Sequence, residues 1–130
     1  MNILITGVTG FVGRHLVAHL RDEAPGAEIW GLVWEEDPGL VPPGVHRLTG
    51  DLTLPSSLAR GLERVRPDVV VHLAGATTVA SSRQQPDRSF QDNSIGTLHL
   101  LESLRSLGGD PVVDVSTSAE IYGAVDRERQ

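Results

Sequence analysis

The chain has 130 residues, a formal net charge of −6 and no cysteine. This length predicts one domain with a single core. The acidic balance argues against a nucleic-acid-binding surface, and the lack of cysteine excludes disulfide and thiolate chemistry. All 11 basic residues are arginine, so a mechanism that needs an ammonium side chain cannot be completed within these residues. No segment is apolar for long enough to span a membrane, and a strand begins directly after Met1 without room for a signal peptide, which predicts a cytoplasmic protein.

Strand and helix patterns alternate along the chain, which is typical of a parallel sheet with crossover helices. Strands are expected at Asn2–Thr6, Glu28–Val33, Val45–Leu48, Asp68–Leu73 and Pro111–Val115. Helical segments are expected at Phe11–Asp22, Asp51–Arg66 and Gln85–Leu107. Right-handed crossovers place the strands in the order 3-2-1-4-5, an α/β doubly wound parallel sheet of the Rossmann type. Its ligand crevice is expected over the carboxyl ends of strands one and four.

Each expected helix carries a row of residues at helical spacing that predicts its inner face. The three rows are Val12, Leu16 and Leu20; Leu54, Leu58, Leu62 and Val65; and Phe90, Thr97, Leu101 and Leu104.

Three glycines at three-residue spacing, Gly7, Gly10 and Gly13, join the first strand to the first helix. Glycine permits a tight turn and a close approach of the backbone, and a helix N-terminus presents free N–H groups to an anion. The spacing differs from G-x-G-x-x-G, but the strand-to-helix context is the one that a dinucleotide pyrophosphate needs. A glycine turn without a ligand is the alternative, although such a connection needs one glycine and not three.

Carboxylates follow the second and third strands. Glu35 lies near the distance at which an acidic residue takes the adenosine ribose hydroxyl in NAD proteins, and no arginine is adjacent in sequence to suit a 2′-phosphate. This pattern favours NAD over NADP, with ordinary solvated charge at Glu35 and Glu36 as the alternative. Asp51 either accepts the adenine amino group or caps the following helix, and both roles are compatible.

Small residues, Ala74 and Gly75, follow the fourth strand and allow a cofactor to approach the backbone. Hydroxyls at Ser116–Ser118 follow the fifth strand at the same edge, where they either face a nicotinamide ring or form a polar turn. The five histidines are scattered without a third ligand in register, so no metal site is expected.

These motifs occur in order over nearly the whole chain. They are Thr6–Gly13, Gly50–Leu52, His72–Gly75, Asn93 with Gly96 and Thr97, and Val115–Gly123. Taken together, these motifs make the chain resemble the extended short-chain dehydrogenase/reductases of the NAD-dependent epimerase/dehydratase family, which modify nucleotide sugars. Within that family it looks most like GDP-4-keto-6-deoxymannose reductases and GDP-mannose 4,6-dehydratases, with epimerases and decarboxylases left open. The reductases would favour NADP and an arginine near Trp34.

The resemblance implies a role for each matching residue. The pyrophosphate would be held by Gly7, Gly10, Phe11, Val12 and Gly13. Adenine would be contacted by Asp51 and Leu52, the cofactor flanked by Leu73, Ala74 and Gly75, and the site supported by Asn93. Ser118 matches the catalytic Ser/Thr, and Glu120 stands where sugar-nucleotide 4,6-dehydratases also carry Glu. The neighbouring Asp of those dehydratases is Ala119 here, which counts against a dehydratase that uses that acid.

The resemblance also places part of the enzyme outside these residues. The family's Tyr-x-x-x-Lys pair follows on a later helix, and Tyr122 is not that tyrosine because Asp126 stands four residues after it. Residues 1–130 are therefore expected to be the N-terminal part of an NAD(P)-binding Rossmann domain. Its last strands and the sugar-binding domain would be absent from the chain.

The leading hypothesis is an NAD(P)-dependent nucleotide-sugar epimerase, dehydratase or reductase that transfers hydride at a sugar carbon. It implies NAD, or NADP as the alternative, a nucleotide-sugar substrate, a homodimer of the full-length protein and an inactive 130-residue chain. The competing hypothesis is a non-catalytic dinucleotide-binding or redox-sensing module, which the lack of lysine favours.

Overall fold

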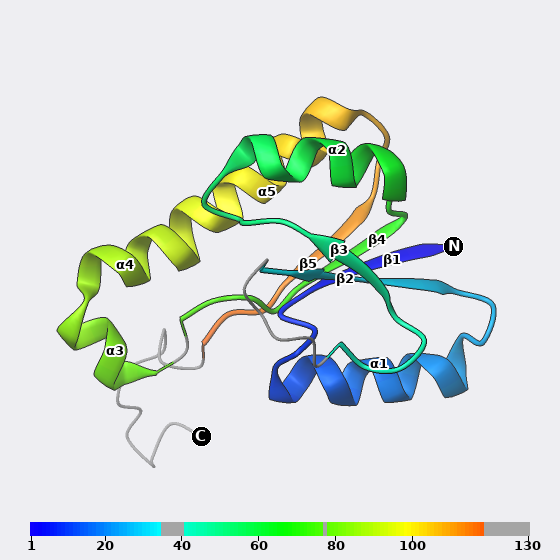
Figure 1. Cartoon of the computed structure of the whole chain (residues 1–130), viewed down its shortest axis with the longest axis horizontal. Coiled ribbons are helices and arrows are strands. Elements are labelled where there is room, and N and C mark those ends of the chain that lie inside the picture. The colour runs from blue at the N-terminus through cyan, green and yellow to red at the C-terminus, as the bar shows by residue number, and fades with distance from the viewer. Residues whose placement is uncertain (35–40, 77, 119–130) are drawn as a thin grey trace, which may run out of the picture.

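A parallel five-stranded sheet in the order β3-β2-β1-β4-β5 forms the centre of the computed structural model, which describes residues 1–34, 41–76 and 78–118 (Figure 1). The order is the one that the sequence predicts. The strands are β1 (Asn2–Thr6), β2 (Glu28–Val33), β3 (His46–Thr49), β4 (Val69–His72) and β5 (Val112–Val115). The helices are α1 (Phe11–Glu23), α2 (Pro55–Val65), α3 (Val79–Gln84), α4 (Pro86–Phe90), a π-helical turn (Gln91–Ile95) and α5 (Gly96–Leu107). No helix within the described ranges is long and apolar enough to cross a membrane.

The sheet is covered on both faces, by α1 on one side and by α2 with α5 on the other (Figure 1). Alternate residues of β1 therefore enter two separate cores. Ile3 and Ile5 pack with Val17 of α1, whereas Leu4 packs with the buried residues of α2 and α5. Burial on both faces explains why β1 is an unbroken apolar run and not an alternating pattern.

The inner face of α1 differs from the predicted one. Val12 is exposed, and the fully buried positions are Gly13 and Val17, with Leu16 and Leu20 partly buried beside them. The face begins at Gly13 because the helix backbone itself packs on the glycine-rich turn there, where a Cβ would lie 2.4 Å from the Gly7 oxygen. In α2 the predicted row holds for Leu58, Leu62 and Val65, but Leu54 is the exposed N-cap residue.

The long helix predicted at Gln85–Leu107 is divided into α4, the π turn and α5, and the short helix α3 before it was not predicted. In the π turn, the N–H of Gly96 bonds to the carbonyl five residues back, at Gln91. The wider turn shifts the helical register, so that residues before and after it no longer share one face. Phe90, before the turn, is exposed. Within α5 the residues that face the core are Leu100 and Leu104, and Leu101 beside them is exposed.

Candidate functional site

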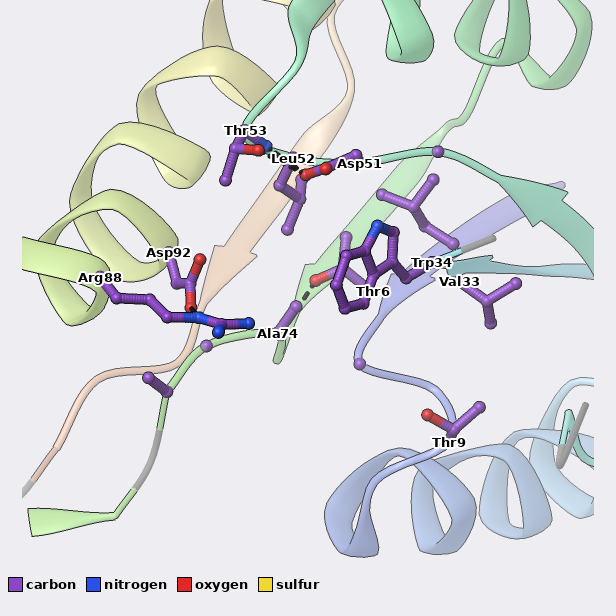
Figure 2. A pocket seen from close by; sticks show the side chains of 15 residues that line it. Thr6, Thr9, Val33, Trp34, Asp51, Leu52, Thr53, Ala74, Arg88 and Asp92 are labelled. Carbon is purple, nitrogen blue, oxygen red and sulfur yellow. Dashed lines mark hydrogen bonds and ion pairs between the residues drawn. The ribbon is translucent and has the colours of Figure 1, made fainter. Parts of the chain in front are cut away.

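A pocket of about 470 Å³ lies at the carboxyl edge of the sheet, at the crevice expected between β1 and β4 (Figure 2). The ends of β1 and β2, the segments after the first four strands, α4 and the π turn line it. They include Thr6, Gly7 and Thr9; Leu32–Trp34; Gly50–Thr53; Ala74–Ala76; and Arg88 and Asp92. Five residues predicted to bind a cofactor thus meet in one pocket: Gly7, Asp51, Leu52, Ala74 and Gly75.

The glycine-rich turn lies close to the end of β4. Gly7 has φ of +69°, a left-handed conformation that favours glycine, and a Cβ on it would lie 2.8 Å from the amide nitrogen of Ala74. A Cβ on Gly10 would meet, among the described residues, only the Gly7 oxygen at 3.1 Å. Gly7 is therefore required by the protein's own packing, whereas a Cβ on Gly10 would be in tight contact with one backbone atom.

Helix α1 begins directly after Gly10, which is its N-cap and makes no side-chain capping bond. The first N–H groups of a helix have no partner within the helix, and here they belong to Phe11, Val12 and Gly13. The side chains of Phe11 and Val12 are exposed and do not line the pocket. The backbone N–H groups of these residues are therefore the groups that a ligand at the helix N-terminus would meet.

Asp51 is held in a side-chain turn. Its Oδ1 accepts hydrogen bonds from the Thr53 amide at 2.8 Å and the Thr53 hydroxyl at 2.7 Å, both through one carboxylate oxygen. The hydroxyl of Ser57 donates to the backbone oxygen of Asp51 at 2.9 Å. The predicted capping role is wrong, because the N-cap of α2 is Leu54. Asp51 instead lines the pocket, with its carboxylate turned toward Thr53 (Figure 2).

Trp34 is a pocket residue that the sequence analysis did not assign. Its side chain is about half exposed, at 52%, and its indole extends into the pocket from the end of β2 (Figure 2). Arg47 of β3 lies beside the end of β2, where its Nη2 donates to the Trp34 backbone oxygen at 3.4 Å. An arginine thus lies near the end of β2 although none is adjacent in sequence. The predicted ribose ligand, Glu35, lies outside the described residues.

Asn93 joins the π turn to the segment after β4. Its Oδ1 accepts from the Ala76 amide at 2.6 Å, and its Nδ2 donates to the Ala76 oxygen at 3.1 Å. A Cβ on Gly75 would lie 2.6 Å from Asn93 Oδ1, so the two segments are in close contact. Asn93 and Leu73 are not among the residues that line the pocket, but Ala76, to which Asn93 bonds, is.

Arg88 and Asp92 line the pocket from the helical side, with Nε and Oδ2 3.7 Å apart. Figure 2 shows the Arg88 side chain extending toward Ala74. No local pattern in the sequence indicates this pair, because its approach to the sheet depends on how α4 is placed.

Of the two predicted catalytic residues, the structure describes only Ser118. Ser118 ends the described part of the chain, is exposed and is not among the residues that line the pocket. Glu120 lies outside the described residues. Within those residues, no cluster of three or more His, Cys, Asp or Glu side chains could hold a metal ion.

The model of the NAD dependent epimerase/dehydratase family matches residues 3–130. The chain is 37% identical over 123 residues to a GDP-6-deoxy-D-mannose reductase of Pseudomonas aeruginosa, covering 95% of this chain and 36% of the relative. It is 33% identical over 132 residues to a UDP-glucose 4-epimerase of Erwinia amylovora, covering 95% and 39%. The chain therefore spans little more than a third of the length of these relatives.

Solved structures agree with this similarity. The UDP-glucose 4-epimerase of Thermus thermophilus, in complex with NAD, superimposes with a TM-score of 0.84 at 35% identity, covering 98% of this chain and 41% of that one. A Pseudomonas aeruginosa structure named RMD, complexed with NADPH, superimposes with a TM-score of 0.76 at 32% identity, covering 98% and 39%.

Proposed function

The chain belongs to the NAD-dependent epimerase/dehydratase family, and from this premise we propose that it is the dinucleotide-binding, N-terminal part of a nucleotide-sugar epimerase, dehydratase or reductase. The enzyme would transfer a hydride between a sugar carbon and NAD, with NADP as the alternative. The observation that carries the proposal is the convergence of the glycine-rich turn with Asp51, Leu52, Ala74 and Gly75 in one pocket at the strand crossover.

The pyrophosphate would lie on the glycine-rich turn, where Gly10 leaves room and the amides of Phe11, Val12 and Gly13 point out of the helix. Backbone donors suit this acidic chain, because they hold an anion without clustered cations. One guanidinium lies beside the turn, since Arg14 Nε donates to the Thr9 oxygen at 2.9 Å.

The adenosine end would lie between Trp34 and the Asp51–Leu52 segment. Asp51 uses Oδ1 for Thr53, and a carboxylate oxygen toward the pocket would accept the adenine amino group. Glu35 would bind the ribose hydroxyl, and Leu73–Gly75 would flank the cofactor, whose bound nicotinamide supplies the hydride chemistry. Asn93 would hold this last segment in place through Ala76.

Catalysis would need groups from beyond this pocket. Ser118 would orient the reacting hydroxyl and Glu120 would assist, but a proton acceptor is also required to take the proton of an alcohol at neutral pH. The resemblance implies a Tyr-x-x-x-Lys pair for this task, and residues 1–130 contain no lysine. The enzymatic names of the relatives support an enzyme over a non-catalytic module.

We infer that the full-length protein is a homodimer in the cytoplasm. Phe90, Leu98 and Leu101 are exposed on α4 and α5, and an exposed group of large apolar side chains is typical of a protein–protein interface. A second copy would cover them.

Calorimetric titration of the protein with NAD tests the binding part of the proposal, and saturable binding of one NAD per chain is expected. Absence of binding would contradict it. For the complete enzyme, NAD(P)H absorbance with GDP- and UDP-sugars tests the reaction, and turnover by the purified 130-residue chain alone would contradict the assignment of the proton acceptor to residues outside 1–130.

A further inference from the structure

Strands β1 and β4 separate at the pocket. Their last paired residues are Thr6 and His72. Beyond this pair, the Leu73 and Ala74 amides both donate to the Thr6 hydroxyl oxygen, at 3.2 and 3.0 Å. Leu73 also reaches the Thr6 carbonyl, but at a longer 3.3 Å. Where the crevice opens, the Thr6 hydroxyl oxygen therefore accepts the amide hydrogen bonds of the segment after β4, in addition to the Thr6 carbonyl.

The Thr6 hydroxyl sets the direction of a longer chain of hydrogen bonds. Two amides donate onto its oxygen, so its single proton goes to Nδ1 of His72, 2.6 Å away. Because Nδ1 accepts, the neutral ring carries its proton on Nε2, which donates to the Thr97 hydroxyl at 2.8 Å. Thr97 in turn donates to the Asn93 backbone oxygen at 2.6 Å. The direction is fixed at both ends, because the two amides can only donate to Thr6 and the Asn93 carbonyl can only accept from Thr97.

His72 fits this position because it is buried. The residue is 3% exposed, and burial lowers the pKa of His72 below its ordinary value of 6.5, which favours the neutral ring. A neutral imidazole presents an acceptor and a donor on opposite edges of one rigid plane. If the ring gained a second proton, Nδ1 would become a donor and could no longer accept the hydrogen bond from the Thr6 hydroxyl.

The two ends of this hydrogen-bonded chain hold the same short segment. At one end Thr6 binds the Leu73 and Ala74 amides, directly against Gly7 of the glycine-rich turn. At the other end Asn93 binds both backbone groups of Ala76. Residues 73–76 are therefore clamped at both ends, and His72 connects the two clamps.

We propose that His72, as the Nε2–H tautomer, is a positioning residue that fixes residues 73–76 relative to Gly7 and so sets the width of the crevice that receives the dinucleotide. The proposal rests on the proposed function, because it assumes that a dinucleotide enters this crevice. His72 itself does not line the pocket. It acts through Thr6 on one side and through Thr97 and Asn93 on the other.

Thr97 is the best place to interrupt the connection, because it too lies outside the pocket lining. Thr97→Val keeps the shape of the side chain but removes both the acceptor for His72 and the donor to Asn93. We expect NAD to bind about tenfold more weakly to this variant, since a buried donor is left without its partner. Thr97→Ser restores the hydroxyl and should bind NAD close to wild type. Leu104→Ala, a core change on the same helix, is the control for stability: it should lower the melting temperature without changing the NAD affinity.

Nitrogen-15 NMR of the His72 ring provides a readout that a general loss of stability would not move. The wild type and Thr97→Ser should show a protonated Nε2 and an unprotonated Nδ1. A ring protonated on Nδ1 in the wild type would overturn the proposal. So would equal NAD affinity of wild type and Thr97→Val. If the wild type binds no dinucleotide, both the proposed function and this inference fail. If the wild type binds NAD and Thr97→Val binds it equally well, this inference fails and the proposed function stands.

Discussion

Gly13 packs so closely against Gly7 that a Cβ on Gly13 would lie 2.4 Å from the Gly7 carbonyl oxygen. The first turn of α1 therefore rests on the glycine-rich turn through backbone atoms alone. A Cβ on Gly10, between them in sequence, would meet only the Gly7 oxygen, at 3.1 Å, among the described residues. Three glycines that look equivalent in the sequence thus have different tasks, which can be separated by substitution.

Gly13→Ala should destabilise the protein. The added methyl would collide with backbone atoms of Gly7 and Val8, which cannot rotate away as a side chain can. Overpacking of this kind costs about 1–3 kcal/mol in free energy of unfolding. Urea unfolding followed by circular dichroism measures the effect, and a free energy equal to that of the wild type would show that α1 can shift to make room.

Gly10→Val should weaken NAD binding by about tenfold or more, because the side chain would occupy the space above the helix N-terminus. Its Cβ would lie 3.1 Å from the Gly7 oxygen, a tight contact, so the melting temperature of the variant is measured beside its NAD affinity. Gly26→Val is a matched control in the turn after α1, where a Cβ meets no described atom within 4 Å. Calorimetry should show normal NAD affinity for the control. Equal affinity of Gly10→Val and wild type would place the pyrophosphate elsewhere.

Trp34 should report on the adenosine end of the ligand. It is one of two tryptophans, and the other, Trp30, is partly buried and stacked on His46. In a Trp30→Phe background, the remaining fluorescence comes from Trp34. NAD and ADP-ribose should both change it, whereas nicotinamide mononucleotide, which lacks adenine, should have little effect. A response to nicotinamide mononucleotide alone would reverse the proposed orientation of the dinucleotide.

NAD should bind more tightly than NADP, because the carboxylates of Glu35 and Glu36 follow β2 and would repel a 2′-phosphate. The two dissociation constants should be compared at one salt concentration, since charge effects are screened by salt. Arg47 supplies the opposing possibility, as its guanidinium reaches the Trp34 oxygen. Tighter binding of NADP that is lost in Arg47→Ala would contradict the expected preference and assign the 2′-phosphate to Arg47.

The sheet could be predicted from the sequence because each strand has a local signature. β1 and β4 are apolar runs with few polar residues, and right-handed crossovers then allow one strand order. Because the carboxyl ends of parallel strands lie at one edge of the sheet, the residues that follow them meet there. The presence of Asp51 and Ala74 in the site could therefore be predicted. These predictions use only neighbours in sequence and the rules of parallel sheets.

The other parts of the site depend on distant contacts that have no local signature. Arg88 lies in the pocket only because α4 is placed over the strand ends, and the π turn that offsets α4 from α5 is not marked by proline or glycine within Gln91–Ile95. The pairing of Thr6 with His72 follows from the register of β1 and β4, which joins residues 66 positions apart. The motif containing His72 was recognised, but its hydrogen-bond partners required the tertiary structure.

Acidification should destabilise the fold through His72. The pKa of His72 in the folded protein lies below the ordinary value of 6.5, because burial disfavours the charged ring. As the pH falls below 6.5, the unfolded chain takes up a proton that the folded chain does not, so the free energy of unfolding falls until the folded pKa is reached. The slope contributed by one such proton is at most about 1.4 kcal/mol per pH unit.

Urea unfolding of wild type and His72→Asn between about pH 5 and pH 7 isolates this contribution as the difference between the two slopes. Glu102, whose pKa is lowered by Arg105, loses its own contribution only as the pH falls below its ordinary value of 4.5, outside this window. Parallel pH profiles for the two proteins would show that His72 accepts a proton in the folded state as readily as in the unfolded one.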